Sequence, residues 1–287
     1  MDMMRIGFLG PGLMGTGMAM SLARAHPVIT TLHRNRAHEG RLLGAGITVL
    51  ASVEAVAEQA DVLFLCLPNA EVVRDVVERV RGVLTPGAMI VDTSTSLPSV
   101  TREIAVDLSH SRIALIDAPV TGGPAESEAG TLVSMVGASE TDFARVEPFL
   151  QLTSKTIVRM GPPGTGHAAK LINNFITQGQ AALTVEAMRR CDSVGVDMTR
   201  MVEVISASGS RSGTFMAIMP PVVAGHYDGL KFSLENAAKD VRYARAMFAD
   251  AGVPSRLIED GLAAFFDAET RDWPPETYVS GLMRKRP

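Results

Sequence analysis

A glycine-rich turn near the N-terminus restricts the possible folds of this chain more than any other feature. Residues Arg5 to Leu9 have a β-like pattern, a GxGxxG sequence follows, and apolar residues then recur at helical spacing to about Ala25. In this setting the first glycine permits a tight turn, the second lets a pyrophosphate approach the backbone, and the third lets helix and strand pack closely. The helix N-terminus supplies an anion site. The pattern predicts a dinucleotide-binding unit; a purely structural glycine turn is the alternative. The expected cofactor contacts are Gly10, Gly12, Leu13, Met14 and Gly15.

Buried strand-like runs alternate with helix-like segments through the rest of the first half. One run ends at Pro68, a second ends over residues 92–95, and a third, RIALIDAPVTGGP, leads into a glycine turn. Helical patterns over 51–60 and 70–80 indicate an α/β fold with a Rossmann-type doubly wound parallel sheet, whose ligands bind beyond the carboxyl ends of the strands. We expect the sheet to finish with a strand over 132–138, a helix over 140–150 and a strand over 155–160. The residues expected around the crevice are Leu67, Pro68, Ser94, Thr95 and the Thr121–Gly123 turn.

The segment after the second predicted strand, Val28 to about His33, indicates the choice of cofactor. A fold that selects NAD places an acid there to accept from the ribose 2′-hydroxyl. This chain has Arg34, Asn35 and Arg36 instead, with no acid until Glu39. Because guanidinium groups bind phosphate in bidentate fashion, the sequence predicts that NADP(H) is preferred and NAD(H) remains possible. Two solvated loop arginines are the alternative.

The turn after the third strand can bind an anion. Thr121, Gly122 and Gly123 can present a hydroxyl and successive backbone N–H groups, which form the kind of concavity that holds a carboxylate. We therefore expect substrate to bind at this turn.

Helical patterns dominate after Gly164, and strand patterns are scarce. We expect a Rossmann domain over residues 1–163 and an all-helical domain over 164–287, joined by a long helix in the stretch from Gly161 to Arg190. Further helices are expected over 199–207, 214–224, 232–251 and 256–268.

One face of the long helix is polar. Lys170, Asn173, Asn174, Thr177 and Gln178 lie at spacings of three, four, seven and eight residues. A solvated face is the ordinary explanation. However, solvated faces usually carry Glu, Lys and Gln, whereas Asn has poor helix propensity. Two adjacent asparagines beside a lone lysine indicate side chains kept for chemistry.

Two other features of the second half are candidates for the site. Arg211, in the loop SASGSRSGTF, can meet an anionic substrate, and an exposed loop arginine is an equal alternative. Lys239 and Asp240 interrupt a helical pattern of small and apolar residues. A surface pair is the alternative there.

Composition excludes several classes of function. A net charge of −4 and an isoelectric point near 5.9 indicate no nucleic-acid partner, and the basic run Arg284–Arg286 is expected to be a solvated end. Cys66 and Cys191 are far apart and lack neighbours at metal-ligand spacing, so we expect no disulfide, no metal site and two buried thiols. Neither a cleavable signal nor an apolar span of membrane length is evident, so we expect a soluble, cytoplasmic protein.

Four motifs in this order resemble those of one family. They are GFLGPGLMG with MAMSLA after it, VDTSTSLPS, DAPVTGGPAESEAGTL and GTGHAAKLINN, followed by Lys239 and Asp240. Together they span nearly the whole chain and resemble the β-hydroxyacid dehydrogenases, which include 3-hydroxyisobutyrate dehydrogenase, tartronate semialdehyde reductase and the glyoxylate/succinic semialdehyde reductases. The resemblance implies hydride transfer between NAD(P) and a small β-hydroxy acid or its semialdehyde.

The resemblance also implies roles for individual residues. Lys170 matches the catalytic lysine, which removes a proton in oxidation and donates it in reduction. Asn174 matches the asparagine that helps to hold the substrate. Thr121–Gly123 match the carboxylate site, where a bound carboxylate determines which carbon faces the nicotinamide. The residues expected near the nicotinamide end of the cofactor are Thr95, Lys239 and Asp240, of which Lys239 is also a candidate substrate contact.

The chain departs from the family pattern at three places. Thr121 replaces the usual serine, which keeps the hydroxyl and adds a methyl group that narrows the pocket. Glu126 and Ser127 stand where the family usually has Gly-Ala, so we expect that loop to differ. The arginines after the second strand fit an NADPH-dependent semialdehyde or glyoxylate-type reductase better than an NAD-dependent 3-hydroxyisobutyrate dehydrogenase.

Alternative functions remain open. An imine reductase-like enzyme shares the fold, although those relatives usually replace the catalytic lysine. 6-Phosphogluconate dehydrogenase, a larger relative with a longer helical domain, is disfavoured by chain length. A non-catalytic NADP-binding interaction module belongs to another class of protein, and Lys170 with Asn174 counts against it. We expect a small-molecule carboxylate substrate, a homodimer or homotetramer, and no nucleic-acid or membrane partner.

Overall fold

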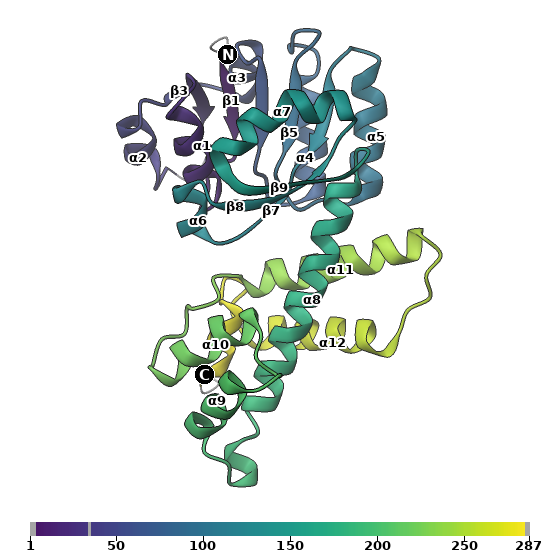
Figure 1. Cartoon of the computed structure of the whole chain (residues 1–287). Coiled ribbons are helices and arrows are strands. Elements are labelled where there is room, and N and C mark those ends of the chain that lie inside the picture. Colours follow the sequence, from purple (N-terminus) through teal and green to yellow (C-terminus); the bar gives the residue numbers. More distant parts are fainter. Residues whose placement is uncertain (1–3, 34–35, 285–287) are drawn as a thin grey trace. The chain divides into compact units, whose positions relative to one another are not determined.

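The computed structural model of the protein describes residues 4–33 and 36–284 (Figure 1). The chain folds into two compact units, Met1–Lys170 and Leu171–Pro287. The sequence pattern placed the boundary after residue 163, before the long helix α8 (Thr165–Met188). The two compact units meet within α8, so this one helix contributes to both.

The first unit is built on a sheet in which six strands are parallel. Their order is β3-β2-β1-β4-β5-β6, which is the Rossmann order. These strands are β1 (Ile6–Leu9), β2 (Val28–Thr31), β3 (Thr48–Leu50), β4 (Val62–Leu65), β5 (Met89–Asp92) and β6 (Ala114–Asp117). The predicted doubly wound fold is confirmed.

The far edge of the sheet is mixed, which the sequence pattern did not predict. Strand β8 (Leu132–Gly137) runs antiparallel to β6 and to the short strand β7 (Val120–Thr121), and β9 (Ser154–Gly161) runs parallel to β8. Since β7 is Val120–Thr121, the Thr121–Gly123 segment lies at the end of β7, before the chain returns antiparallel as β8.

Helices cover both faces of the parallel strands, and the strand residues alternate between two cores. Phe8 and Phe64 face one core and stack with ring centroids 6.1 Å apart, whereas Leu63 and Leu65 face the other. Helices α1 (Gly15–Ala23) and α7 (Glu140–Thr153) pack on the first face, and α3 (Val53–Glu58), α4 (Ala70–Val80) and α5 (Pro98–Ser109) pack on the second. The short helices α2 (Glu39–Gly44) and α6 (Pro124–Ala129) complete the unit.

The second unit is helical apart from a bridge between Ser233 and Tyr278 in its described residues. It contains the end of α8, then α9 (Met198–Ala207), α10 (Gly213–Val223), α11 (Leu234–Asp250) and α12 (Leu257–Asp272), with 3₁₀ turns η1 (Asp192–Val194) and η2 (Val279–Met283). All these helices contribute to one apolar core. The guanidinium of Arg189 donates to Glu269 at 2.6 Å and to the carbonyl of Leu282 at 2.6 and 2.9 Å. These bonds tie the end of α8 to α12 and to η2.

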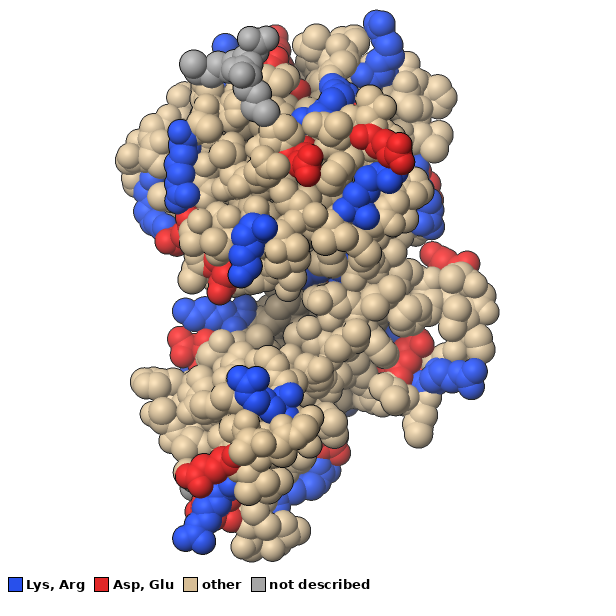
Figure 2. Space-filling model, viewed as in Figure 1, with Lys and Arg blue, Asp and Glu red and all other residues tan. Residues whose placement is uncertain are grey.

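One face of the molecule is mixed in charge. On the face drawn in Figure 2, basic and acidic side chains are interspersed, and no broad area of one sign appears among the residues coloured there. No helix in the described ranges combines the length and apolar character needed to cross a membrane. Of the two free cysteines, Cys191 is buried and Cys66 is half-buried, so the expectation of two buried thiols holds fully only for Cys191.

Candidate active site

The three glycines of the N-terminal turn have different geometric roles. Gly10 has φ +93°, and a Cβ there would lie 2.2 Å from the carbonyl oxygen of Cys66. A Cβ on Gly15 would lie 2.1 Å from the carbonyl oxygen of Gly10. A Cβ on Gly12, by contrast, would meet no described atom within 4 Å. The fold itself therefore requires Gly10 and Gly15, whereas the space beside Gly12 is open among the described atoms.

The carboxyl ends of β1, β4 and β5 meet beside this turn. The backbone of Gly10 lies against Cys66 and Leu67, and the N–H of Leu67 donates to the hydroxyl of Ser94 at 2.8 Å. Thr95 follows and is half-buried, while Leu13 is exposed at the open side of the turn. The structure thus brings together Gly10, Leu67 and Ser94.

The segment expected to choose the cofactor is described only in part. Arg34 and Asn35 lie outside the described residues. Arg36 is exposed and forms a bidentate ion pair with Glu39, at 2.5 and 2.8 Å. This pairing raises the pKa of the Arg36 guanidinium and lowers that of the Glu39 carboxyl. The nearest acid in sequence therefore already occupies the guanidinium fork of Arg36.

The Thr121–Gly123 turn is shaped by the residues that depart from the family pattern. Gly122 has φ +129°, and the N–H of Gly123 donates to the carboxylate of Glu126 at 2.9 Å. Hydrogen bonds from the backbone N–H groups of Glu126 and Gly123 lower the pKa of this carboxyl, so it is ionised near neutral pH. One N–H group that was expected to meet a substrate carboxylate is therefore engaged within the loop.

Ser127 connects the same loop to the glycine-rich turn. It is fully buried, and its hydroxyl donates to the carbonyl oxygen of Met14 at 2.7 Å. A Cβ on Gly17 of α1 would lie 2.6 Å from the Ser127 hydroxyl. Helices α6 and α1 therefore pack at backbone distance, and a larger residue at position 17 would separate them.

Helix α8 buries much of its polar face. Its polar residues Lys170, Asn174 and Gln178 are only 8%, 4% and 0% exposed. The opposite face carries exposed apolar residues, Ile172 at 48%, Ile176 at 55% and Leu183 at 71%. A solvated polar face is therefore not what the fold contains. Neither amide atom of Gln178 has a hydrogen-bond partner among the described residues, so this face retains both a donor and an acceptor.

Asn174 joins a buried polar cluster with α11. Its Nδ2 donates to Asp240 Oδ2 at 2.6 Å, and Asn173 donates to Asn174 Oδ1 at 3.3 Å. Lys239 Nζ lies 3.4 Å from Asp240 Oδ1, within ion-pair range. Asp240 is buried, so Lys239 and Asp240 are not a surface pair. The second unit thus unites three of the predicted residues, whereas Arg211 lies exposed in the loop between α9 and α10.

Buried polar residues that the sequence pattern did not single out surround the start of α8. The buried side chains of Asp92, Thr101, Asp117 and His167 gather there. Burial raises the pKa of the Asp117 carboxyl, while His167 and the N–H groups of Gly164 and His167 oppose that shift. The GTGHAAK motif contains this histidine, but only the fold shows which carboxylates surround it.

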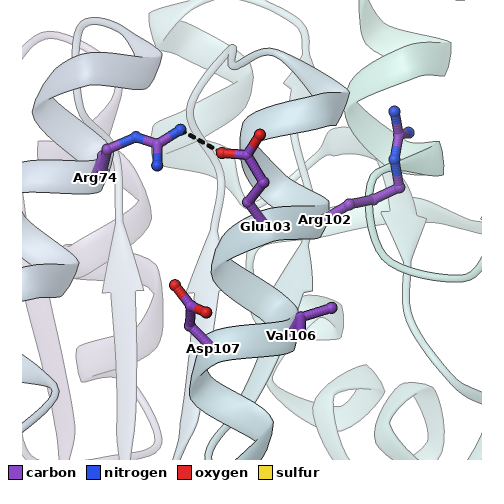
Figure 3. Close-up of a pocket in the computed structure, with 5 residues that line it drawn as sticks. All are labelled: Arg74, Arg102, Glu103, Val106 and Asp107. Atoms are coloured by element: carbon purple, nitrogen blue, oxygen red, sulfur yellow. Dashed lines mark hydrogen bonds and ion pairs between the residues drawn. The ribbon is translucent and has the colours of Figure 1, made fainter.

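A separate depression lies on the outer surface of α4 and α5 (Figure 3). It is lined by Arg74, Arg102, Glu103, Val106 and Asp107, with Arg74 and Glu103 paired at 2.6 Å. None of the predicted site residues lines it. Its charged, exposed walls are typical of a solvated surface, so we do not associate it with the active site.

The sheet order and the glycine turn define a dinucleotide-binding fold, and a buried lysine and asparagine lie one turn apart on α8. The family model described as the NAD binding domain of 6-phosphogluconate dehydrogenase matches residues 5–161. The model described as NAD-binding of NADP-dependent 3-hydroxyisobutyrate dehydrogenase matches residues 164–272.

Individual relatives agree with these matches. The chain is 33% identical over 254 residues to 2-(hydroxymethyl)glutarate dehydrogenase of Eubacterium barkeri, which covers 87% of this chain and 84% of the relative. It is 28% identical over 258 residues to 3-sulfolactaldehyde reductase of Escherichia coli, covering 89% and 87%. The solved structure of Mycobacterium tuberculosis 3-hydroxyisobutyrate dehydrogenase with L-serine superposes with a TM-score of 0.86 at 27% identity, over 98% of each chain. The protein belongs to the β-hydroxyacid dehydrogenase family and is an NAD(P)-dependent oxidoreductase.

Proposed function

We propose that the protein interconverts a small β-hydroxy acid and its aldehyde or semialdehyde, with NADP(H) preferred and Lys170 as the general acid and base. The observation that carries this proposal is the burial of Lys170 and Asn174 on the inner face of α8. A buried lysine with a polar neighbour one turn away is an arrangement suited to proton transfer at a substrate oxygen.

The nicotinamide, when bound, supplies or accepts the hydride. In the reducing direction Lys170 Nζ donates a proton to the carbonyl oxygen of the substrate, and in the oxidising direction it removes the hydroxyl proton. Asn174 Nδ2 carries two hydrogens, and Asp240 accepts only one of them. The second hydrogen is available to a substrate oxygen, so Asp240 orients Asn174 for that contact.

The residues of the first unit fit the remaining parts of both ligands. The open space at Gly12 suits a pyrophosphate at the N-terminus of α1. Thr121 and Gly122 can offer a hydroxyl and an N–H group to a substrate carboxylate. The N–H of Gly123 can do so only after it releases the carboxylate of Glu126. Thr95 and Lys239 are proposed at the nicotinamide end, and Arg211 is proposed to meet an anionic substrate.

The preference for NADP(H) rests on Arg34, Asn35 and Arg36, which replace the acid that NAD-selecting folds use. Arg34→Ala with Arg36→Ala should weaken NADPH binding at least about tenfold more than NADH binding, because only NADPH carries the 2′-phosphate. Arg41→Ala is the matched control, since Arg41 is a nearby surface arginine paired with Glu128. Equal losses for the two cofactors would refute the phosphate assignment.

The substrate class is tested by following NADPH and NADH oxidation against glyoxylate, succinic semialdehyde, methylmalonate semialdehyde, tartronate semialdehyde and a cyclic imine. We expect turnover of at least one aldehyde acid and none of the imine. Turnover of the imine alone would instead assign the protein to the imine reductase-like alternative. Cofactor binding without turnover of any compound would favour a non-catalytic binding module.

A further inference from the structure

The helix that carries Lys170 is capped by a carboxylate from a different element. Asp117, at the end of β6, is fully buried. Its Oδ1 accepts from the N–H of Gly164 at 2.7 Å, and its Oδ2 accepts from the N–H of His167 at 2.8 Å. The first N–H groups of a helix have no partner within the helix, and a negative charge is favourable there. Asp117 therefore satisfies two donors at the start of α8.

The His167 ring extends this cap toward the strand ends. Its Nε2 lies 3.2 Å from the carbonyl oxygen of Ser94, and its Nδ1 lies 2.7 Å from the hydroxyl of Thr101. A carbonyl oxygen only accepts, so Nε2 carries a hydrogen. In the neutral ring Nδ1 then accepts from Thr101. Carboxylate oxygens of Asp92 and Asp117 lie 3.8 Å from Nε2 and Nδ1 respectively.

The start of α8 also meets the sheet at backbone distance. A Cβ on Gly166 would lie 2.5 Å from the carbonyl oxygen of Met135 and 2.7 Å from that of Asp117. A Cβ on Gly137 would lie 2.2 Å from Asp117 Oδ1. These glycines leave the first turn of α8 almost no room to shift. The hydrogen bonds of Asp117 thus act on a closely packed contact.

This cluster joins three segments that the proposed function uses. Asp92 Oδ1 accepts from the N–H of Ser94 at 3.0 Å, next to Thr95. Asp117 precedes Thr121 by four residues, and His167 precedes Lys170 by three. We propose that Asp117, acting with His167, is a positioning residue that holds the first turn of α8 and so places the Lys170 ammonium against the ends of β5 and β6. This inference depends on the proposed role of Lys170.

The test compares Asp117→Asn with Asp197→Asn. Asp197 also caps a helix, since its Oδ1 accepts from the N–H of Arg200 at 2.8 Å at the start of α9. Asparagine at position 117 keeps the shape, but its amide can accept from only one of the two N–H donors. Because a displacement of about 1 Å can cost about 100-fold in rate, we expect Asp117→Asn to lower kcat about 10- to 100-fold. NADPH affinity should stay within about threefold, and Asp197→Asn should match the wild type.

A second pair of variants covers the case in which Asp117→Asn does not fold. Thr101→Val removes the hydroxyl from His167 Nδ1, whereas Thr101→Ser retains it. We expect Thr101→Val to lower kcat at least about threefold with an unchanged NADPH affinity, and Thr101→Ser to restore it. Wild-type kcat in Thr101→Val, or in folded Asp117→Asn, would refute the proposal.

Hydrogen exchange provides a readout that does not require turnover. Asp117→Asn should accelerate amide exchange over residues 164–170 at least about tenfold, while Asp197→Asn should leave that segment unchanged. Unchanged exchange there would refute the positioning role whatever the activity. A fully active Lys170→Ala variant would instead refute the proposed function, so the two failures can be told apart.

Discussion

At the residue scale, the structure distinguishes the roles of glycines that look equivalent in a motif. The GxGxxG pattern predicted the turn correctly because its glycines are local in sequence. It did not show that Gly10 and Gly15 are required by contacts within the fold and that Gly12 faces open space among the described atoms. Contacts such as Gly10 with Cys66 join residues far apart in the sequence, so no local pattern contains them.

Substitutions at Gly10 and Gly12 should therefore affect different properties, the stability of the fold and the affinity for NADPH respectively. Gly12→Ala should weaken NADPH binding at least about tenfold without lowering Tm, because the methyl group enters only the space a pyrophosphate needs. Gly10→Ala should lower the free energy of unfolding by about 1–3 kcal/mol or more, because of the positive φ and the contact with Cys66. NADPH titration and thermal melts measure both. A lower Tm in Gly12→Ala with unchanged affinity would contradict this assignment.

Cys66 should be unreactive in the native protein. Burial raises the pKa of its thiol to about 11, although a hydrogen bond with Thr93 opposes the shift. The reactive thiolate is then about one in a thousand at pH 8. Alkylation of native Cys66 by iodoacetamide, followed by peptide mass spectrometry, should accelerate about tenfold per pH unit up to pH about 11, whereas the unfolded chain reacts readily at pH 8.5. A rate that levels off below pH 9 would disprove the raised pKa.

At the element scale, helices with a clear apolar periodicity were predicted best. Helix α4 was predicted at its observed bounds, 70–80, and in the structure Asn69 caps it by accepting from the N–H of Val72 at 2.9 Å. Helices α2, α5 and α6 were missed. Two are only six residues long, and α5 begins at Pro98 directly after a polar segment that reads as a strand end.

Helix α8 shows what periodicity cannot supply. The spacing of Lys170, Asn174 and Gln178 predicted a polar face, but periodicity does not reveal which face the fold buries. The cap from Asp117 could not be predicted from local sequence patterns either, because it joins residues about fifty positions apart.

Helix α6 should influence substrate affinity through Glu126. Its ionised carboxylate accepts from the Gly123 N–H, and we expect it to compete with and repel a substrate carboxylate at this turn. Glu126→Gln keeps an acceptor for that N–H and removes the charge, so KM for an aldehyde acid should fall about 3- to 10-fold with little change in kcat. Glu128→Gln, on the same helix but paired with Arg41, is the control. Steady-state kinetics showing an unchanged or higher KM in Glu126→Gln would rule out competition at this turn.

At the scale of the whole molecule, we expect the exposed apolar face of α8 to take part in self-association. Ile172, Ile176 and Leu183 form one exposed stripe along the helix in the second unit. An exposed apolar stripe on a helix is typical of an interface, and a second copy of the chain is the partner we expect.

Light scattering after gel filtration should therefore give two or four times the chain mass of 30.5 kDa. Ile176→Lys with Leu183→Lys should shift the protein toward the monomer, because both charges would have to be buried in the interface. Val204→Lys, at an exposed valine on α9, is the control. A monomeric wild-type protein would contradict the expected homodimer or homotetramer.

The proton transfer proposed for Lys170, on the buried polar face of α8, is tested most directly by single-turnover oxidation of NADPH with a substrate aldehyde acid, comparing wild type, Lys170→Ala and Lys170→Arg. We expect the rate to fall about 100- to 10,000-fold in Lys170→Ala while NADPH affinity stays within about threefold. Lys170→Arg should not restore the rate, because a guanidinium does not release its proton near neutral pH. A Lys170→Ala rate within about tenfold of wild type would contradict the assignment.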